Sequence, residues 1–228
     1  SSSSSSSSSF ALDVYVADMM NFRVQKFTPN GVFILKWGNV GLSDGNFNLP
    51  VGVVISQEGY VYVADTESHR IQKFDRLGIF QAKWGSQGTG NSQFESPKGI
   101  TADSLNNIYV ADTGNSRIQK FDKNGLYITQ WGFAGPSTVL GAFDEPWGID
   151  VGAHSYIYIA DTGNDQIQVY SNNGHWLFTF GSSGEADGQF TSPTGIAVDK
   201  NNNVYVVDML QHRVQKFDEN GNFLLKWG

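Results

Sequence analysis

The sequence contains no cysteine and only 6 prolines, and charged residues make up just 16% of its 228 residues. The absence of cysteine excludes disulfides, thiolate metal sites and a cysteine nucleophile. No apolar run approaches the roughly 18 residues needed to cross a bilayer, so we expect no membrane insertion. The formal net charge of −7 disfavours nucleic acid as a partner, because the phosphate backbone binds clustered lysine and arginine.

What the sequence does contain is glycine, 26 residues of it, and an internal repeat. The segment Val-Tyr-Val-Ala-Asp at 14–18 recurs at 61–65 and, with small changes, three more times. Each copy continues to a segment resembling Arg-Ile-Gln-Lys-Phe and ends on an aromatic residue followed by glycine. A fixed period of this length indicates a repeat architecture. The tyrosines that mark the five copies are Tyr15, Tyr62, Tyr109, Tyr158 and Tyr205.

The last copy predicts four short strands, at Gly195–Asp199, Asn203–Asp208, Arg213–Phe217 and Phe223–Trp227. They are rich in β-branched and aromatic residues and are joined by short turns, so successive strands pair as antiparallel neighbours. Four antiparallel strands in a repeated unit are typical of an all-β β-propeller. The predicted blades cover approximately residues 1–38, 50–85, 97–132, 146–181 and 193–228.

The repeat also resembles a known family. Pro-x-Gly-Ile-Ala-Val-Asp, as at 193–199, and Ala-Asp-Thr-Gly-Asn-x-Arg-Ile-Gln-Lys-Phe-Asp, as at 111–122, are similar to the NHL repeat, and the likeness extends over nearly everything after Ser9. The resemblance implies a propeller, usually of six blades, that serves most often as a binding platform. The five copies are therefore expected to form a five-bladed ring or part of a six-bladed one.

Residues 1–9 are an unbroken serine run. One interpretation is a tag or linker, since such polar runs do not build a core. The other is a placeholder for an unidentified inner strand, because counting back one period places Ser3–Ser9 where Pro193–Asp199 lies in the fifth copy. The predicted NHL-type propeller then covers residues 10–228.

An Asp that ends the second strand and an Arg five residues later recur in four copies, as in Asp112 and Arg117. A pair present in every such blade is expected to fix the loop between them rather than to catalyse a reaction. Blade four has Gln166 in place of the arginine, which leaves Asp161 without that partner.

The loop joining strands two and three and the link into the next blade lie on one face of a propeller, and this loop face is the expected binding surface. If the ring closes with five blades, the apolar loops of blades one and five form one patch, suited to a partner or to a neighbouring blade. Residues after the link proline are expected at the mouth of the central channel. The candidate binding residues are Met19, Met20, Phe22, His69, Lys98, Trp147, Asp161, Gln166, Met209, Leu210 and His212.

No catalytic constellation is predicted. His69 and His212 share one loop position, whereas His154 falls on the opposite face, so the histidines do not converge on a zinc ion. In the related peptidyl-hydroxyglycine lyases, a zinc-binding histidine lies between the link proline and glycine. The resemblance does not carry that metal site over, because these positions here are Val51, Lys98, Trp147 and Thr194.

The leading hypothesis is a non-catalytic interaction or assembly module that presents the loop face to a protein or glycan partner, in an extracellular or envelope setting. No cofactor is predicted, although calcium and zinc stay open. Two alternatives are a metal-dependent lyase or hydrolase with its site at the channel mouth, and a structural subunit that self-assembles or belongs to a longer chain with further domains.

Overall fold

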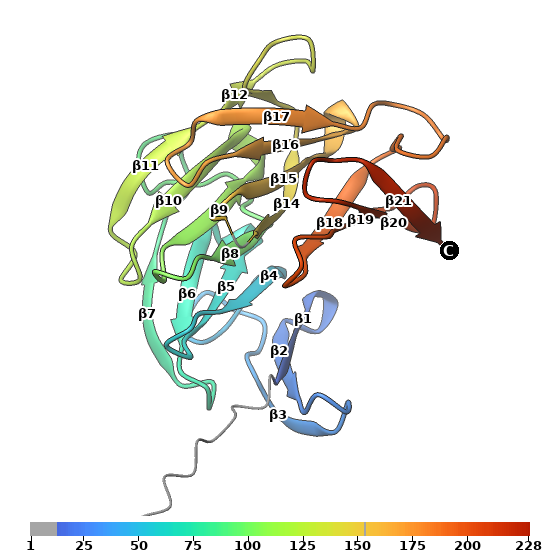
Figure 1. Ribbon diagram of the computed structural model, residues 1–228. Coiled ribbons are helices and arrows are strands. Elements are labelled where there is room, and N and C mark those ends of the chain that lie inside the picture. The colour runs from blue at the N-terminus through green and yellow to red at the C-terminus, as the bar shows by residue number, and fades with distance from the viewer. Residues whose placement is uncertain (1–12, 153) are drawn as a thin grey trace, which may run out of the picture.

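The computed structural model describes residues 13–152 and 154–228, and it shows an all-β propeller (Figure 1). Five antiparallel sheets follow one another along the chain, and within each sheet the strands pair in sequence order. Helical structure in the described residues is limited to four 3-10 turns, so none of their helices could span a membrane. The serine run and its predicted inner strand lie outside the described residues.

The strand boundaries reproduce the predicted four-strand unit. Blade one contains β1 (Val14–Asp18), β2 (Arg23–Phe27) and β3 (Phe33–Trp37). Blade two contains β4 (Pro50–Ile55), β5 (Val61–Asp65), β6 (Arg70–Phe74) and β7 (Phe80–Trp84). Blade three contains β8 (Ile100–Ala102), β9 (Ile108–Asp112), β10 (Arg117–Phe121) and β11 (Tyr127–Trp131).

Blade four contains β14 (Pro146–Val151), β15 (Ile157–Asp161), β16 (Gln166–Tyr170) and β17 (Trp176–Phe180), and blade five contains β18 (Pro193–Val198), β19 (Val204–Asp208), β20 (Arg213–Phe217) and β21 (Phe223–Trp227). The longer link into blade four adds a short parallel pair, β12 (Phe133–Ala134) with β13 (Ala142–Phe143). The 3-10 turns are η1 (Met19–Asn21), η2 (Thr66–Ser68), η3 (Thr113–Asn115) and η4 (Thr162–Asn164).

The core lies between the blades because successive residues of a strand point to opposite faces of its sheet. On β5, Val61 and Val63 pack towards blade one, whereas Tyr62 and Ala64 pack towards blade three. All four side chains are fully buried. A strand of this kind reads as a continuous apolar run rather than as an alternation, as a strand buried on both faces must.

Each blade is also fastened to the next by an aromatic residue at the end of its outer strand. The Trp84 ring lies 5.7 Å from the Phe121 ring of blade three and covers Gly125 in the hairpin of that blade. Gly125 has a φ of +85°, and a Cβ there would fall 2.6 Å from the indole, so the hairpin needs glycine for both its backbone and its close approach. We call this contact the aromatic–glycine lock.

The ring is open between blade five and blade one (Figure 1). On the side of blade one that faces away from blade two, Val14 and Val16 are 45% and 40% exposed. On the side of blade five that faces away from blade four, Val207 and Trp227 are 41% and 47% exposed. Of the two predicted arrangements, part of a six-bladed ring is the one that this open side fits. The apolar loops of blades one and five flank an open side and do not form one closed patch.

Candidate functional site

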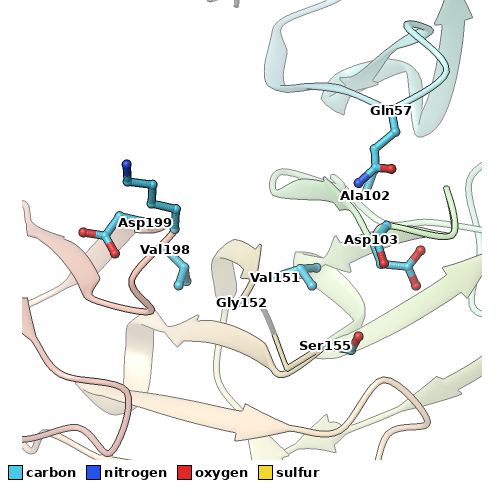
Figure 2. Close-up of a pocket in the computed structure, with 10 residues that line it drawn as sticks. Gln57, Ala102, Asp103, Val151, Gly152, Ser155, Val198 and Asp199 are labelled. Carbon is cyan, nitrogen blue, oxygen red and sulfur yellow. The ribbon is translucent and has the colours of Figure 1, made fainter.

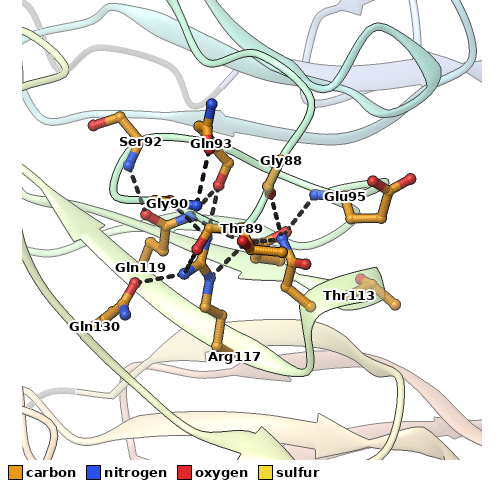
Figure 3. A network of polar contacts seen from close by, with 12 residues as sticks. Gly88, Thr89, Gly90, Ser92, Gln93, Glu95, Thr113, Arg117, Gln119 and Gln130 are labelled. Carbon is orange, nitrogen blue, oxygen red and sulfur yellow. Dashed lines mark hydrogen bonds and ion pairs between the residues drawn. The ribbon is translucent and has the colours of Figure 1, made fainter.

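The repeated Asp–Arg pair is a structural element of the blade, as predicted. In blade three, Arg117 Nε donates to Asp112 Oδ2 at 2.7 Å, and its two terminal nitrogens donate to the link carbonyls of Thr89, Gly90 and Gln93 (Figure 3). The Asp112 side chain is fully buried, and its other oxygen accepts the backbone N–H of Glu95. The pair thus ties the link to its own blade, and a site must be sought elsewhere.

In blade four, the buried aspartate is bound by amide side chains in place of an arginine. The Asp161 carboxylate accepts hydrogen bonds from Gln166 Nε2, Gln168 Nε2 and Asn164 Nδ2, each within 2.9 Å. Burial raises the pKa of Asp161, and these donors and the backbone N–H of Asp144 oppose the rise. Asp161 and Gln166 are buried beneath the loop face and bind each other, so neither presents its side chain to a partner.

The residues after the link prolines meet at the channel mouth on the loop face. Val51, Lys98, Trp147 and Thr194 line one cavity of about 460 Å³, each contributed by a different blade. Val207 and Met209 of blade five complete its wall on the open side of the ring. The four link residues thus share one cavity, and two of the binding candidates, Lys98 and Trp147, belong to it; their part in binding stays a prediction.

Lys98 and Trp147 form a pair at this mouth. The Lys98 Nζ lies 3.7 Å from the centre of the Trp147 ring, a cation–π contact between blades three and four. Partial burial lowers the pKa of Lys98, and the negative charges of Glu145 and Glu67 act against this shift. The arrangement places an ammonium donor on an aromatic platform in a mainly apolar hollow.

The glycine of each Pro-x-Gly sequence explains how the link residues come so close to the axis. A Cβ on Gly99 would overlap the carbonyl oxygen of Trp147, and a Cβ on Gly148 would overlap that of Thr194. Because these glycines have no side chain, the main chain of the next blade lies directly against them. The side chain between proline and glycine is thereby directed to the channel rim.

The remaining candidates are spread over the loop face. His69 and His212 occupy equivalent left-handed positions, with φ of 50° and 51°. His69 Nδ1 accepts the backbone N–H of Ser96 at 3.1 Å, so it serves the link into blade three. Met20 and Leu210 are 70% and 59% exposed. Met19, Phe22 and Met209 are partly or largely exposed, and of these loop residues only Met209 lines the channel-mouth cavity.

The opposite mouth of the channel holds a second cavity, of about 270 Å³ (Figure 2). Asp103 and Asp199 lie on opposite sides of it, and each carboxylate is already bound within its own turn. Asp199, for example, accepts from Asn201 N, Asn203 N, Asn203 Nδ2 and Tyr205 Oη. These acids stabilise turns and leave no carboxylate pair directed at a ligand.

Within residues 13–152 and 154–228 no three side chains of the His, Asp and Glu types come together as a metal site would require. In the described residues, His154 lies 3.6 Å from Glu219, and His69 lies 3.9 Å from Glu95. The histidines of the described residues are therefore dispersed.

Comparison with known proteins supports the repeat and the fold. The family model described as the NHL repeat matches residues 47–74 and 94–121, and one described as a 6-bladed beta-propeller matches residues 150–226. No curated protein matches the sequence.

Several solved structures share the fold. A streptogramin B lyase superposes with a TM-score of 0.70 at 14% identity, over 94% of this chain and 64% of the lyase. A catalytically inactive virginiamycin B lyase from Staphylococcus aureus, solved with quinupristin, gives 0.68 at 15% identity, over 93% and 65%. A protein of unknown function from Bacteroides caccae gives 0.66 at 11% identity, over 94% and 72%. The chain spans 64–65% of the length of these lyases, which is less than two thirds, and the likeness concerns the fold alone.

The sheets, their order and the locks between them define a β-propeller. Within that class, the family model shows NHL repeats at residues 47–74 and 94–121, and the same motif recurs in the other three copies of the repeat.

Sequence reasoning missed the pairing of Lys98 with Trp147 and the part that Val207 takes in the cavity wall. The shared position of Lys98 and Trp147 in consecutive repeats was the signal for their proximity. Their stacking depends on how far consecutive blades are rotated about the axis, which the sequence does not state.

Proposed function

We propose that this propeller is a non-catalytic interaction module that binds a protein or glycan partner at the channel mouth on the loop face. The observation that carries the proposal is the Lys98–Trp147 pair in the cavity of about 460 Å³. Its neighbours in the cavity are the mainly apolar Val51, Thr194, Val207 and Met209.

The chemistry of the pair supports a ligand that combines a flat or apolar surface with hydrogen-bond acceptors. The indole of Trp147 offers a platform for a side chain or a sugar ring, and tryptophan is enriched where interfaces derive their affinity. The Lys98 ammonium offers donors to a carbonyl, carboxylate or hydroxyl oxygen. Both a protein loop and an oligosaccharide carry these groups.

The non-catalytic part of the proposal rests on the hydrogen bonds and ion pairs that the acidic and basic side chains already make within the blades. The buried aspartates of the blades hold links and arginines, and His69 accepts a backbone N–H. Among the described residues, the acidic side chains that act on the charge of Lys98 are Glu145 and Glu67. Elemental analysis of the purified protein tests this part, and a stoichiometric zinc or calcium ion would favour the lyase or hydrolase alternative.

The binding part is tested on an immobilised array of peptides and oligosaccharides probed with labelled protein. Trp147→Ala and Lys98→Ala should each lose at least tenfold in signal on the spots that the wild type binds. Trp176→Ala is the matched control, since Trp176 is 40% exposed on the outer strand of blade four and away from the mouth. Equal signals for Trp147→Ala and wild type would contradict the proposal, and the class of spot that responds distinguishes peptide from glycan.

A further inference from the structure

A lysine on the third strand of a blade contacts the next blade on the face opposite the loop face. Lys73 Nζ donates to the carbonyl oxygen of Lys123 at 2.9 Å and lies 4.0 Å from the centre of the Tyr60 ring. Lys120 Nζ likewise donates to the carbonyl oxygen of Asn172 at 2.8 Å. Each acceptor lies in the turn between strands three and four of the next blade. In blade two the ammonium is thus held between an aromatic ring and a carbonyl oxygen.

Blade four lacks this lysine, because Val169 stands where the other four blades have lysine. The groups that hold an ammonium in blade two nevertheless have counterparts between blades four and five. By the register of the repeat, Tyr156 corresponds to the stacking tyrosine, and Glu219 corresponds to the residue that supplies the carbonyl acceptor. The Glu219 carbonyl accepts the Tyr158 hydroxyl at 3.3 Å, and no lysine in residues 13–152 and 154–228 donates to it. Blade four thus keeps the position for an ammonium and lacks the lysine.

A cavity of about 410 Å³ lies between blades four and five at this position. It is lined by Tyr156 and Glu219 together with His154, Leu177, Phe178 and Asn220. Phe178 pairs across the sheet with Val169, whereas the residue that pairs with Lys73 in blade two is Ala82. The exchange of lysine and alanine for valine and phenylalanine makes this strand pair apolar and removes the ammonium. The cavity therefore has an apolar wall opposite the tyrosine and the glutamate.

The charge of the hairpin residue is reversed at the same interface. Between blades two and three, Lys123 Nζ lies 2.6 Å from Glu58 Oε1. Between blades four and five, Glu219 takes the place of that lysine, and His154 takes the place of that glutamate. His154 Nε2 lies 3.6 Å from Glu219 Oε2. A lysine at the hairpin repels a second ammonium, whereas the Glu219 carboxylate attracts one. The interface without its own lysine is thus the one whose hairpin carries an acid.

From these observations we infer that the cavity between blades four and five binds the side chain of a lysine on a partner protein. The ammonium would lie against the Tyr156 ring and beside Glu219, and the methylene stem would lie along Leu177 and Phe178. One lining carboxylate matches one positive charge. Because the cavity is on the face opposite the channel mouth, the inference goes beyond the function proposed above.

Three observations favour the lysine of a protein over a free amine or an arginine. The rim is accessible to a macromolecule, since the side chains of His154 and Glu219 are 62% and 46% exposed. The group that fills the equivalent position in blade two is itself a lysine side chain, which reaches the ring and the carbonyl from a protein backbone. An arginine binds a carboxylate best through two parallel hydrogen bonds, and Glu219 Oε2 already accepts the Asn202 amide at 3.2 Å.

The experiment titrates the isotope-labelled 228-residue chain with the tripeptide Gly-Lys-Gly, blocked at both ends, and follows the protein by NMR. We expect saturable shifts of the backbone amides of Glu219 and Asn220. A tripeptide with norleucine in place of lysine has a similar stem and no ammonium, and it should bind at least tenfold more weakly. The arginine tripeptide and n-butylamine, which supplies the ammonium without a peptide, should each bind more weakly than the lysine tripeptide.

Variants that copy other blades of the chain test the position of the ammonium. Glu219→Lys copies blade three and should weaken binding of the lysine tripeptide at least tenfold, whereas Glu58→Gln, at the equivalent interface of blades two and three, should leave it unchanged. Val169→Lys with Phe178→Ala rebuilds the strand pair of blade two, so the chain's own ammonium should fill the cavity and exclude the tripeptide. Trp147→Ala should bind the tripeptide as the wild type does, which separates this test from that of the channel mouth.

Several results would overturn the inference. The lysine tripeptide could give no saturable shift, or the norleucine tripeptide could bind equally well, which would make the cavity merely apolar. Unchanged binding to Glu219→Lys, a surface change that leaves the fold intact, would exclude the assigned acid. Tighter binding of n-butylamine would assign the cavity to free amines, and tighter binding of the arginine tripeptide would assign it to a guanidinium.

Discussion

Replacing Arg117 by glutamine copies into blade three the residue that blade four carries naturally at Gln166, and it tests whether the Asp–Arg pair stabilises the blade. The guanidinium of Arg117 is almost fully buried and binds Asp112, Gln130 and three link carbonyls, all within 2.9 Å. Glutamine reaches Asp112 at best and leaves the carboxylate without a cation and the carbonyls without their donors.

Breaking a buried ion pair by removing one partner costs about 3–5 kcal/mol. For a chain of this length that corresponds to a fall of roughly 6–20 °C in the melting midpoint, at about 2–4 °C per kcal/mol. Urea unfolding followed by circular dichroism gives the free energy, and an unchanged m-value shows that the variant still unfolds as the same unit.

Two controls make the result specific to the buried pair. Lys83→Gln breaks the Lys83–Asp44 ion pair, whose side chains are nearly half exposed, and should cost less than about 1 kcal/mol. The double change Arg117→Gln with Asp112→Asn should recover part of the loss, because no unpaired charge then remains buried. If Arg117→Gln alone costs no more than Lys83→Gln, the structural role assigned to the pair is wrong.

Two further predictions concern protonation. Four hydrogen-bond donors, chiefly the Asn203 side chain, lower the pKa of Asp199 to about 2 from its ordinary value of 3.8. The contribution of Asp199 to stability is therefore present above about pH 4 and is lost as the pH falls from about 4 to 2; Asp199→Asn should flatten this part of the acid unfolding curve, and an unchanged curve would contradict the prediction. Burial lowers the pKa of Lys98, so NMR of the reductively methylated protein should show the Lys98 resonance titrating below the ordinary lysine value. The resonance should also carry an upfield ring-current shift that Trp147→Ala removes, and a Lys98 resonance that titrates at the ordinary value would refute the assignment.

The repeat pattern predicted the four strands of a blade closely, because the β-forming residues, the turn residues and the repeat period all indicate the same segments. Arg213–Phe217 and Phe223–Trp227 were predicted with the bounds that β20 and β21 have, since a polar turn ending in Asn-Gly separates two segments of β-formers. The Asp–Arg pairs were also predicted as structural, because five copies in one chain distinguish what a blade requires from what one position adds.

The closure of the ring was not predictable in the same way. Blade number depends on the angle between neighbouring sheets, and the same lock residues are present whichever angle is adopted. The channel-mouth cavity follows from that angle too, so the sequence placed Lys98 and Trp147 at the rim but did not bring Val207 into its wall. Asp161 and Gln166 were proposed as loop-face candidates because an arginine is missing, whereas the fold buries both beneath the loop that they support.

Every lock has a direction, with the aromatic residue on the earlier blade and the glycine on the later one. A surface of this kind cannot pair with an identical copy of itself across a twofold axis, because indole would meet indole and glycine would meet glycine. Duplication or loss of a repeat in such a chain preserves all the contacts between the blades that remain. Adding or removing a repeat unit therefore keeps the same pairs of residues at each interface, and what changes is the angle between neighbouring blades.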